Sequence, residues 1–225
     1  MMTLKEHIKI DLNLAVPVMM SQLGQVMVGV ADSIMVGQLG PVPLAAAALG
    51  NAIFFFFMTF GLGVSFAITP MVAVADGEGD LAKCGRVLKH GFIINLLLSI
   101  ILFFVIITVN RYLMYFGQEE AVVEETMPYL FIIGLSILPF LVFQTFRQFA
   151  EGLSMTKLPM VISVGANLLN VFLNYVFIFG KFGVPAMGLY GAGLATLIAR
   201  ILMAIIMMVY VLYHEKFKVY WAGVK

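Results

Sequence analysis

The sequence predicts an all-α membrane protein with six transmembrane helices, and three observations lead to this fold class. Of its 225 residues, 62% are hydrophobic and only 11% are charged, too few charges to cover a soluble domain of this size. Six apolar segments each reach the ~20 residues that a helix needs to cross a hydrocarbon core of ~30 Å. None alternates with the period of a barrel strand, and a helix satisfies its own backbone groups in lipid.

The six predicted spans follow one another with short, turn-like connections. They lie at residues 12–37, 44–75, 87–113, 126–150, 158–180 and 188–213. The first is too long for a signal-peptide core and is expected to remain attached. The second is long enough to tilt or to extend into the cytoplasm. Pro17, Pro70, Pro128 and Pro139 fall inside spans, where a proline removes a hydrogen bond and favours a kink.

Basic residues are concentrated on one side of the predicted bundle. The segments on that side carry Lys5, Lys9, Lys83, Arg86, Lys89, Arg147, Lys157, Lys216, Lys218 and Lys225, whereas the loops on the other side carry Arg111 and Lys181. Positively charged loops stay in the cytoplasm, so both termini are predicted to be cytoplasmic, in the cell (inner) membrane.

Asp32 is the only carboxylate in the middle of a predicted span. An ionised carboxylate inside a bilayer is costly and usually marks an ion or proton pathway with a partner nearby. In the fifth span, Asn167, Asn170 and Asn174 share one helix face at ~100° per residue. Counting a rise of ~1.5 Å per residue puts Asp32, Asn170, Asn174 and Thr196 at one depth, in the outer half of the membrane.

A carboxylate, two amide oxygens and a hydroxyl suit a hard cation, and a single negative charge balances Na⁺ or one proton. The asparagines, Asn167 above all, can instead link helices by hydrogen bonds. Arg200, near mid-membrane in the sixth span, leaves two alternatives open. It can pair with Asp32 and neutralise the site, or bond backbone carbonyls exposed at a kink.

No catalytic grouping is present, so no enzyme activity and no cofactor are expected. The sequence lacks a Walker loop, a nucleophile elbow, an HExxH motif and Cys/His metal spacing, and Cys84 is its single cysteine. A net charge of +1 gives no indication of a nucleic-acid partner. Without a nucleotide-binding domain, uphill transport requires an ion gradient, which Asp32 could couple.

Several motifs together resemble the multidrug and toxic compound extrusion (MATE) family. They are Gly29-Val-Ala-Asp32-Ser-Ile-Met-Val-Gly37-Gln-Leu-Gly40 with Leu44-Ala-Ala-Ala, then Gln148-Phe-Ala-Glu151-Gly152-Leu, Asn170-Val-Phe-Leu-Asn174 with Ile178-Phe-Gly180, and Gly191-Ala-Gly-Leu-Ala-Thr196. They occur in the family's order, and the match covers essentially the whole chain.

The resemblance implies a transporter of twelve helices in two six-helix lobes that face each other across a central cleft. Members export organic cations and amphipathic drugs in exchange for Na⁺ or H⁺. The family's cation site in the amino-terminal lobe falls on Asp32, Asn170, Asn174 and Thr196. From their positions in this sequence, Asn167, Arg200 and Pro17 are candidate supporting residues. Some members carry Asp where this chain has Asn174, which leaves the choice between Na⁺ and H⁺ open.

The length matches only the amino-terminal lobe, at residues 1–215, with residues 216–225 as the start of a cytoplasmic linker to a second lobe. The chain is therefore expected to be a fragment, or else a half-transporter that pairs with a copy of itself or a related chain. Two other functions compete with drug export. One is a lipid-linked sugar flippase of the same superfamily, and the other is a membrane scaffold in which Asp32 and Arg200 form a structural pair.

Overall fold

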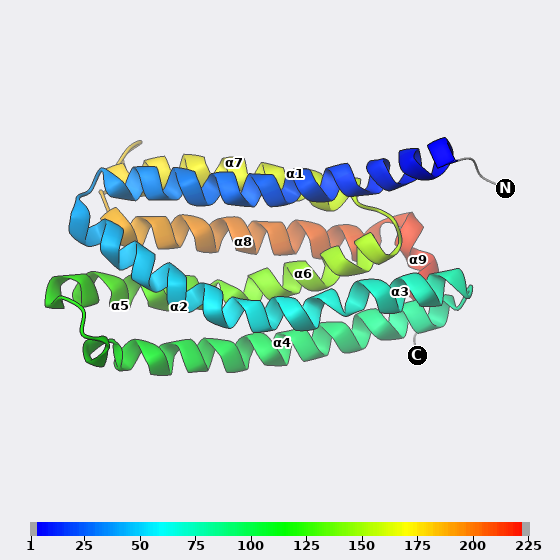
Figure 1. Cartoon of the computed structure of the whole chain (residues 1–225), viewed down its shortest axis with the longest axis horizontal. Coiled ribbons are helices and arrows are strands. Elements are labelled where there is room, and N and C mark those ends of the chain that lie inside the picture. Colours follow the sequence, from blue (N-terminus) through cyan, green and yellow to red (C-terminus); the bar gives the residue numbers. More distant parts are fainter. Residues whose placement is uncertain (1–3, 222–225) are drawn as a thin grey trace.

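A computed structural model describes residues 4–221 of the chain, and long helices run side by side along its length (Figure 1). Six helical stretches in this described part are long and apolar enough to cross a membrane. They are Ala15–Gly37, Pro41–Gly77, Leu81–Arg111, Glu120–Gly152, Lys157–Phe179 and Gly188–Tyr213. The prediction of six spans in this order is confirmed.

Two of the spans consist of two helices each, and a short helix follows the last span. The elements are α1 (Leu4–Gly37), α2 (Pro41–Phe66), α3 (Ile68–Gly77), α4 (Leu81–Arg111), η1 (Leu113–Phe116), α5 (Glu120–Leu135), α6 (Ile137–Gly152), α7 (Lys157–Phe179), α8 (Gly188–Tyr213) and α9 (Glu215–Trp221). The α3–α4 and α6–α7 connections lie at the same end of the bundle as α9 (Figure 1).

Prolines explain where the second and fourth spans are divided. α2 ends before Ala67 and α5 ends before Ser136, and each of these residues lies three positions before a proline, Pro70 or Pro139. A proline lacks the N–H that would continue the helix and clashes with the carbonyl four residues earlier, so the chain breaks there. α1 and α5, by contrast, run through Pro17 and Pro128 without a break, and the kinks expected at these two prolines stay predictions.

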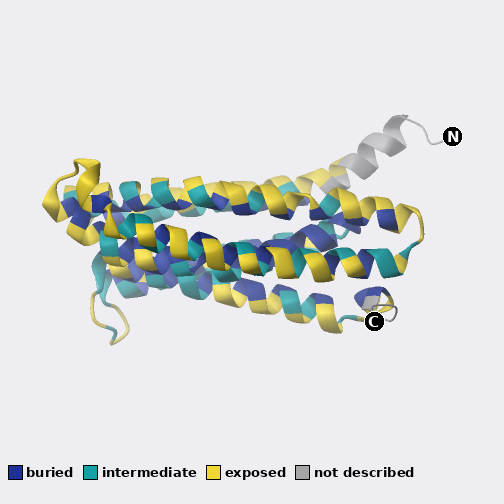
Figure 2. Cartoon of the chain, turned by 90° about the horizontal axis from the view of Figure 1, so that it is seen from below, coloured by how far each residue is buried: buried dark blue, intermediate teal, exposed yellow. Residues whose placement is uncertain are grey.

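The outer surface of the bundle is apolar. Figure 2 shows exposed residues along the outward faces of the helices, and many of them are large hydrophobic side chains. Ile34, Phe56 and Phe104 are each more than 60% exposed. A soluble protein rarely exposes contiguous apolar surface on this scale, whereas a lipid-facing surface requires it. The chain is therefore a multi-pass membrane protein.

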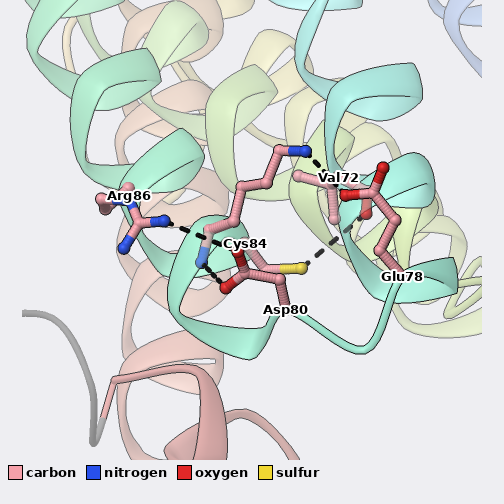
Figure 3. A network of polar contacts seen from close by, with 6 residues as sticks. Val72, Glu78, Asp80, Cys84 and Arg86 are labelled. Carbon is pink, nitrogen blue, oxygen red and sulfur yellow. Dashed lines mark hydrogen bonds and ion pairs between the residues drawn. The ribbon is translucent and has the colours of Figure 1, made fainter.

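Polar contacts fix the turn between α3 and α4 (Figure 3). The Asp80 carboxylate caps α4 by accepting from the Lys83 backbone N–H at 2.8 Å, which satisfies one of the free donors at the helix start. The Lys83 Nζ–Glu78 Oε2 pair, at 2.7 Å, and the Arg86 Nη2–Asp80 Oδ2 pair, at 3.7 Å, are exposed to solvent. Ion pairs of this kind orient a turn but add little stability.

Two residues assigned to loops from the sequence are packed against the bundle. Arg147, counted as a loop charge, lies inside α6 with its side chain only 2% exposed, and it pairs with Glu151 one turn later. Phe217 of α9, in the predicted linker, is fully buried, and its ring packs on that of Phe149 with centroids 6.0 Å apart. The described part of this segment is therefore docked on the bundle, while residues 222–225, Lys225 included, lie outside the described residues.

Glycine permits a close contact between α7 and α8. A Cβ added at Gly191 of α8 would lie 2.8 Å from the backbone carbon and oxygen of Phe177 in α7. Backbone cannot yield as a flexible side chain can, so the two helices would have to separate. Gly50 of α2 and Gly193 of α8 similarly allow close packing against the Tyr129 ring. Small residues at these positions therefore allow the helices to approach closely.

We expect Gly191→Ala to destabilise the protein by about 1–3 kcal/mol, the usual cost of overpacking. The measurement is thermal unfolding of the full-length protein in detergent. Gly63→Ala is the matched control, because Gly63 is an exposed glycine of α2 with open space where its Cβ would be. The explanation fails if both variants unfold at the same temperature as the native protein.

Candidate functional site

A cluster of polar side chains lies where α1, α7 and α8 pack together, near the end of the bundle that holds the α1–α2 turn. Asp32 comes from the last turns of α1, Asn170 and Asn174 from consecutive turns of α7, and Thr196 from the first half of α8. The structure thus brings together the four residues that depth along the predicted helices selects. Their role as cation ligands remains a prediction.

Asn174 makes the direct contact with Asp32. Its Nδ2 donates a hydrogen bond to the Asp32 carboxylate, and its side chain is completely buried. Its Oδ1 has no hydrogen-bond partner among the described residues. A buried amide oxygen without a donor loses its hydration and gains nothing in return. This oxygen, close to a carboxylate, is an acceptor available to a cation or to a proton donor.

Asn170 links the carboxylate to Thr196 in either orientation of its amide. In one orientation its Oδ1 accepts from Asn174 Nδ2 at 3.2 Å and its Nδ2 donates to Thr196 Oγ1 at 3.3 Å. In the other its Nδ2 donates to Asp32 Oδ1 at 3.3 Å, and its Oδ1 accepts from the backbone N–H and the hydroxyl of Thr196 at 3.2 and 3.3 Å. Rotation of the Asn170 amide therefore decides whether its oxygen or its nitrogen faces Asp32.

The donor set fits a small hard cation. One carboxylate, two amide oxygens and one hydroxyl are oxygen ligands of the kind that such ions take. Asn170 and Asn174 are buried, whereas Asp32 is half-buried. The carboxylate remains partly exposed because it forms part of the wall of a cavity.

That cavity has a volume of about 560 Å³ and extends from the polar cluster toward the middle of the bundle. Its polar wall includes Gln22, Gln25 and Asn51 in addition to Asp32, Asn167, Asn170, Thr196 and Arg200. Its apolar wall includes Phe54, Met58, Phe140 and Met203. An apolar chamber with a few convergent polar groups is the usual form of a small-molecule site.

Arg200 lies near Asp32 but does not pair directly with it. No ion pair joins the two in the part of the chain that the structure describes, although both line the cavity. The Arg200 guanidinium instead donates to Ser136 Oγ at 2.6 Å and lies over the Phe54 and Phe140 rings, 4.7 and 4.9 Å from their centroids. Ser136 is the residue at the α5–α6 break. Of the two alternatives, the structure favours attachment at a kink, through a side-chain hydroxyl rather than a carbonyl.

Asn167 and four residues that the sequence analysis missed complete the polar wall, and these four are Gln22, Gln25, Asn51 and Tyr129. Asn167 lines the cavity, and its buried Nδ2 has no hydrogen-bond partner among the described residues. Tyr129 donates through its hydroxyl to Asn51 Oδ1 at 3.0 Å, and both residues line the cavity. Asn51 could have been found, because it is an amide inside an otherwise apolar stretch, the same signal that identified Asn167.

Comparison with known proteins places these features in a family. The MatE family model matches residues 17–176. The multidrug resistance protein NorM of Photobacterium profundum is 36% identical over 207 residues, which are 92% of this chain and 45% of NorM. The multidrug resistance protein MdtK of Yersinia pestis is 36% identical over 186 residues, 82% of this chain and 41% of MdtK. The chain spans about half the length of these curated relatives.

Solved structures share the fold. An outward-facing multidrug resistance MATE family transporter of the MOP superfamily superimposes with a TM-score of 0.85 at 22% identity, over 96% of this chain and 47% of that one. A MOP superfamily transporter from Pyrococcus furiosus gives a TM-score of 0.80 at 22% identity, over 94% of this chain and 46% of that one. The six-helix unit described above therefore corresponds to about half of each of these structures.

Proposed function

This chain belongs to the MatE family, and we propose from this membership and its polar site that it forms one lobe of a cation-coupled drug exporter. The full-length protein moves organic cations and amphipathic drugs out of the cell in exchange for Na⁺ or H⁺. The single observation that carries the proposal is the Asp32 carboxylate. It contacts an amide cluster on α7, has no basic partner among the described residues, and opens onto a large cavity.

The coupling ion occupies the position next to Asp32. When Na⁺ binds, Asp32, Asn170, Asn174 and Thr196 supply oxygen ligands, and the unpartnered Asn174 Oδ1 is the amide oxygen that can turn to it without losing a hydrogen bond. When a proton binds, Asp32 becomes neutral and can donate to a neighbouring amide oxygen. Either event removes the one negative charge from this wall of the cavity.

The transported molecule occupies the cavity that Asp32 borders. Aromatic and methionine side chains such as Phe54, Phe55, Met58 and Met203 line it, and these surfaces adapt to apolar partners of varied shape. A cationic drug gains attraction from the ionised carboxylate and loses it when a cation or proton neutralises Asp32. Competition for one charge therefore couples the entry of the ion to the release of the drug.

A second lobe completes the transporter. The chain covers less than half of the curated relatives NorM and MdtK, and α1 exposes large apolar residues, such as Val26 and Ile34, at 64% and 61%. The partner is a carboxy-terminal lobe joined through the segment that starts with α9, or a second copy of the chain. The excess of basic residues at one end of the bundle supports an orientation in the inner membrane with both termini in the cytoplasm.

The competing functions receive less support. A flippase for a lipid-linked pyrophosphate would favour a basic cavity, yet Arg200 is the one basic residue among those that line it and Asp32 lies in the same wall. A scaffold held together by an Asp32–Arg200 pair is not supported either, since the Arg200 guanidinium bonds Ser136 instead.

The proposal is tested with the full-length protein reconstituted in vesicles that contain a fluorescent organic cation. An imposed Na⁺ or H⁺ gradient should drive efflux of the dye, and the ion whose gradient is effective identifies the coupling. Vesicles without protein, and vesicles with protein but no gradient, provide the baselines. The proposal is wrong if neither gradient accelerates efflux.

We expect Asn174→Asp to bind Na⁺ about ten-fold more tightly, a gain of ~1.4 kcal/mol, because a second carboxylate adds attraction in a poorly solvated site. Sodium titration of the purified full-length protein near neutral pH measures this. Asn110→Asp is the matched control, since Asn110 lies at the far end of α4, outside the cavity wall. Unchanged affinity would argue against Asn174 as a ligand. Weaker affinity that recovers at higher pH would show that two acids share a proton.

A further inference from the structure

A second cavity, of about 350 Å³, lies at the opposite end of the bundle from the Asp32 cluster. It is enclosed by the α6–α7 connection, the start of α7, the last turns of α8 and the start of α9. Its walls are formed by Ala150, Ser154, Met155, Thr156, Lys157, Leu158, Tyr210, Lys216 and Phe217. It shares none of its lining residues with the first cavity, and drug export as proposed above does not use it.

The charge of this second cavity is positive and uncompensated. Lys157 and Lys216 come from different helices, and both residues border the cavity. Neither takes part in an ion pair with any described residue, and no aspartate or glutamate is among the lining residues. Two ammonium groups at one cavity without a carboxylate are suited to an anion.

The start of α7 supplies further donors. The first N–H groups of a helix have no acceptor within the helix, and the helix dipole makes this end attractive to anions. No side chain caps α7 at Thr156. Thr156 borders the cavity, is only 7% exposed, and its side chain forms no hydrogen bond with a described residue. This largely buried side chain has its hydroxyl at the cavity wall with no partner among the described residues, so the hydroxyl is available to a ligand in the cavity.

We propose that this pocket binds a phosphate group, carried by an anionic phospholipid or free in the cytoplasm. Lys157 and Lys216 neutralise its charge, and the Thr156 hydroxyl donates to its oxygens. The backbone N–H groups of Lys157 and Leu158 are the further donors, because Pro159 has no N–H and the Met160 N–H bonds Thr156 O. Met155, Leu158, Tyr210 and Phe217 offer an apolar wall beside it, which suits the glycerol and upper acyl region of a lipid. Basic pockets between helices at the cytoplasmic face are a known form of lipid headgroup site.

A bound phosphate would join two parts of the chain. It bridges the α6–α7 connection to α9, the segment that leaves the bundle after the last span. α9 already packs through Phe217 and through the Tyr220 hydroxyl, which donates to Asp76 Oδ1 at 3.0 Å. The phosphate thus adds a charged contact to an apolar one and holds α9 against the bundle.

The test is a binding titration of the purified full-length protein in neutral detergent at constant ionic strength, followed by thermal unfolding. The probes are a short-chain phosphatidylglycerol, the matching phosphatidylcholine, and inorganic phosphate. The variant is Lys157→Gln with Lys216→Gln. The matched control is Lys181→Gln with Lys218→Gln, which removes the same charge from lysines that are exposed, as Lys157 and Lys216 are, but that lie outside the pocket. Thr156→Val removes the hydroxyl and leaves both charges in place.

We expect saturable stabilisation by phosphatidylglycerol or by inorganic phosphate but not by phosphatidylcholine. Response to the lipid alone identifies a headgroup, and response to inorganic phosphate identifies a free anion. The pocket variant should raise the apparent Kd at least about ten-fold and Thr156→Val should raise it measurably, while the control stays within about two-fold. The proposal is overturned if neither anion stabilises the native protein, or if pocket and control variants lose affinity equally. These outcomes do not depend on drug export, which is measured separately.

Discussion

Asp32→Asn is expected to abolish gradient-driven export while the protein still inserts and folds. Asparagine has nearly the shape of aspartate and can still bond the Asn174 amide, which contacts residue 32 in the structure. It cannot ionise, however, so neither Na⁺ nor a proton gains from binding there, and the cavity loses its one negative charge. Dye efflux from reconstituted vesicles should fall to the level of vesicles without protein.

A matched control tests whether the effect depends on the position of the lost carboxylate or only on the loss of one negative charge. Glu124→Gln removes one carboxylate from the exposed start of α5, away from the cavity, and should leave efflux unchanged. Unfolding temperature and chromatographic behaviour of both variants establish that they fold. Gradient-driven efflux that persists in Asp32→Asn would show that another group couples transport to the ion.

The sequence predicts the fold well because run length and hydrophobicity decide which segments cross a bilayer. The positions of the two helix breaks could also be predicted, since Pro70 and Pro139 each lie three residues after a break. Convergence of Asp32 with Asn174 could be anticipated because the rise per residue gives the depth of each side chain along its helix. Depth does not give the rotation of a helix about its axis.

Because the rotation of each helix about its axis is unknown from the sequence, some side-chain contacts could not be predicted. Whether Arg200 reaches Asp32 depends on how α8 is turned about its axis, and its actual partner, Ser136, lies at the α5–α6 break. The exposure of Asp32 depends on a cavity whose walls come from several helices. Arg147 is counted with the cytoplasmic charges because it lies at the end of the fourth predicted span, and its burial depends on the pairing with Glu151 one turn later.

The Arg147–Glu151 pair gives the second large expected effect. Arg147 Nε lies 2.7 Å from Glu151 Oε1, and the two side chains are 2% and 12% exposed. Gln148 extends the network by donating to the other Glu151 oxygen at 3.4 Å and by accepting from the Thr69 hydroxyl of α3 at 2.6 Å. The network thus links the end of α6 to α3 through Gln148, beside the break that divides the second span.

Glu151→Leu should destabilise the protein by about 3–5 kcal/mol, because it leaves the buried Arg147 guanidinium without a counter-charge. Combining it with Arg147→Met removes both charges and should recover a large part of that loss. Denaturation of the full-length protein in detergent measures both variants. The exposed Lys83–Glu78 pair is the control, since its atoms are also 2.7 Å apart but its side chains are 42% and 54% exposed. Glu78→Leu should cost less than ~1 kcal/mol. Equal costs at the two sites would show that burial does not determine the strength of the Arg147–Glu151 pair.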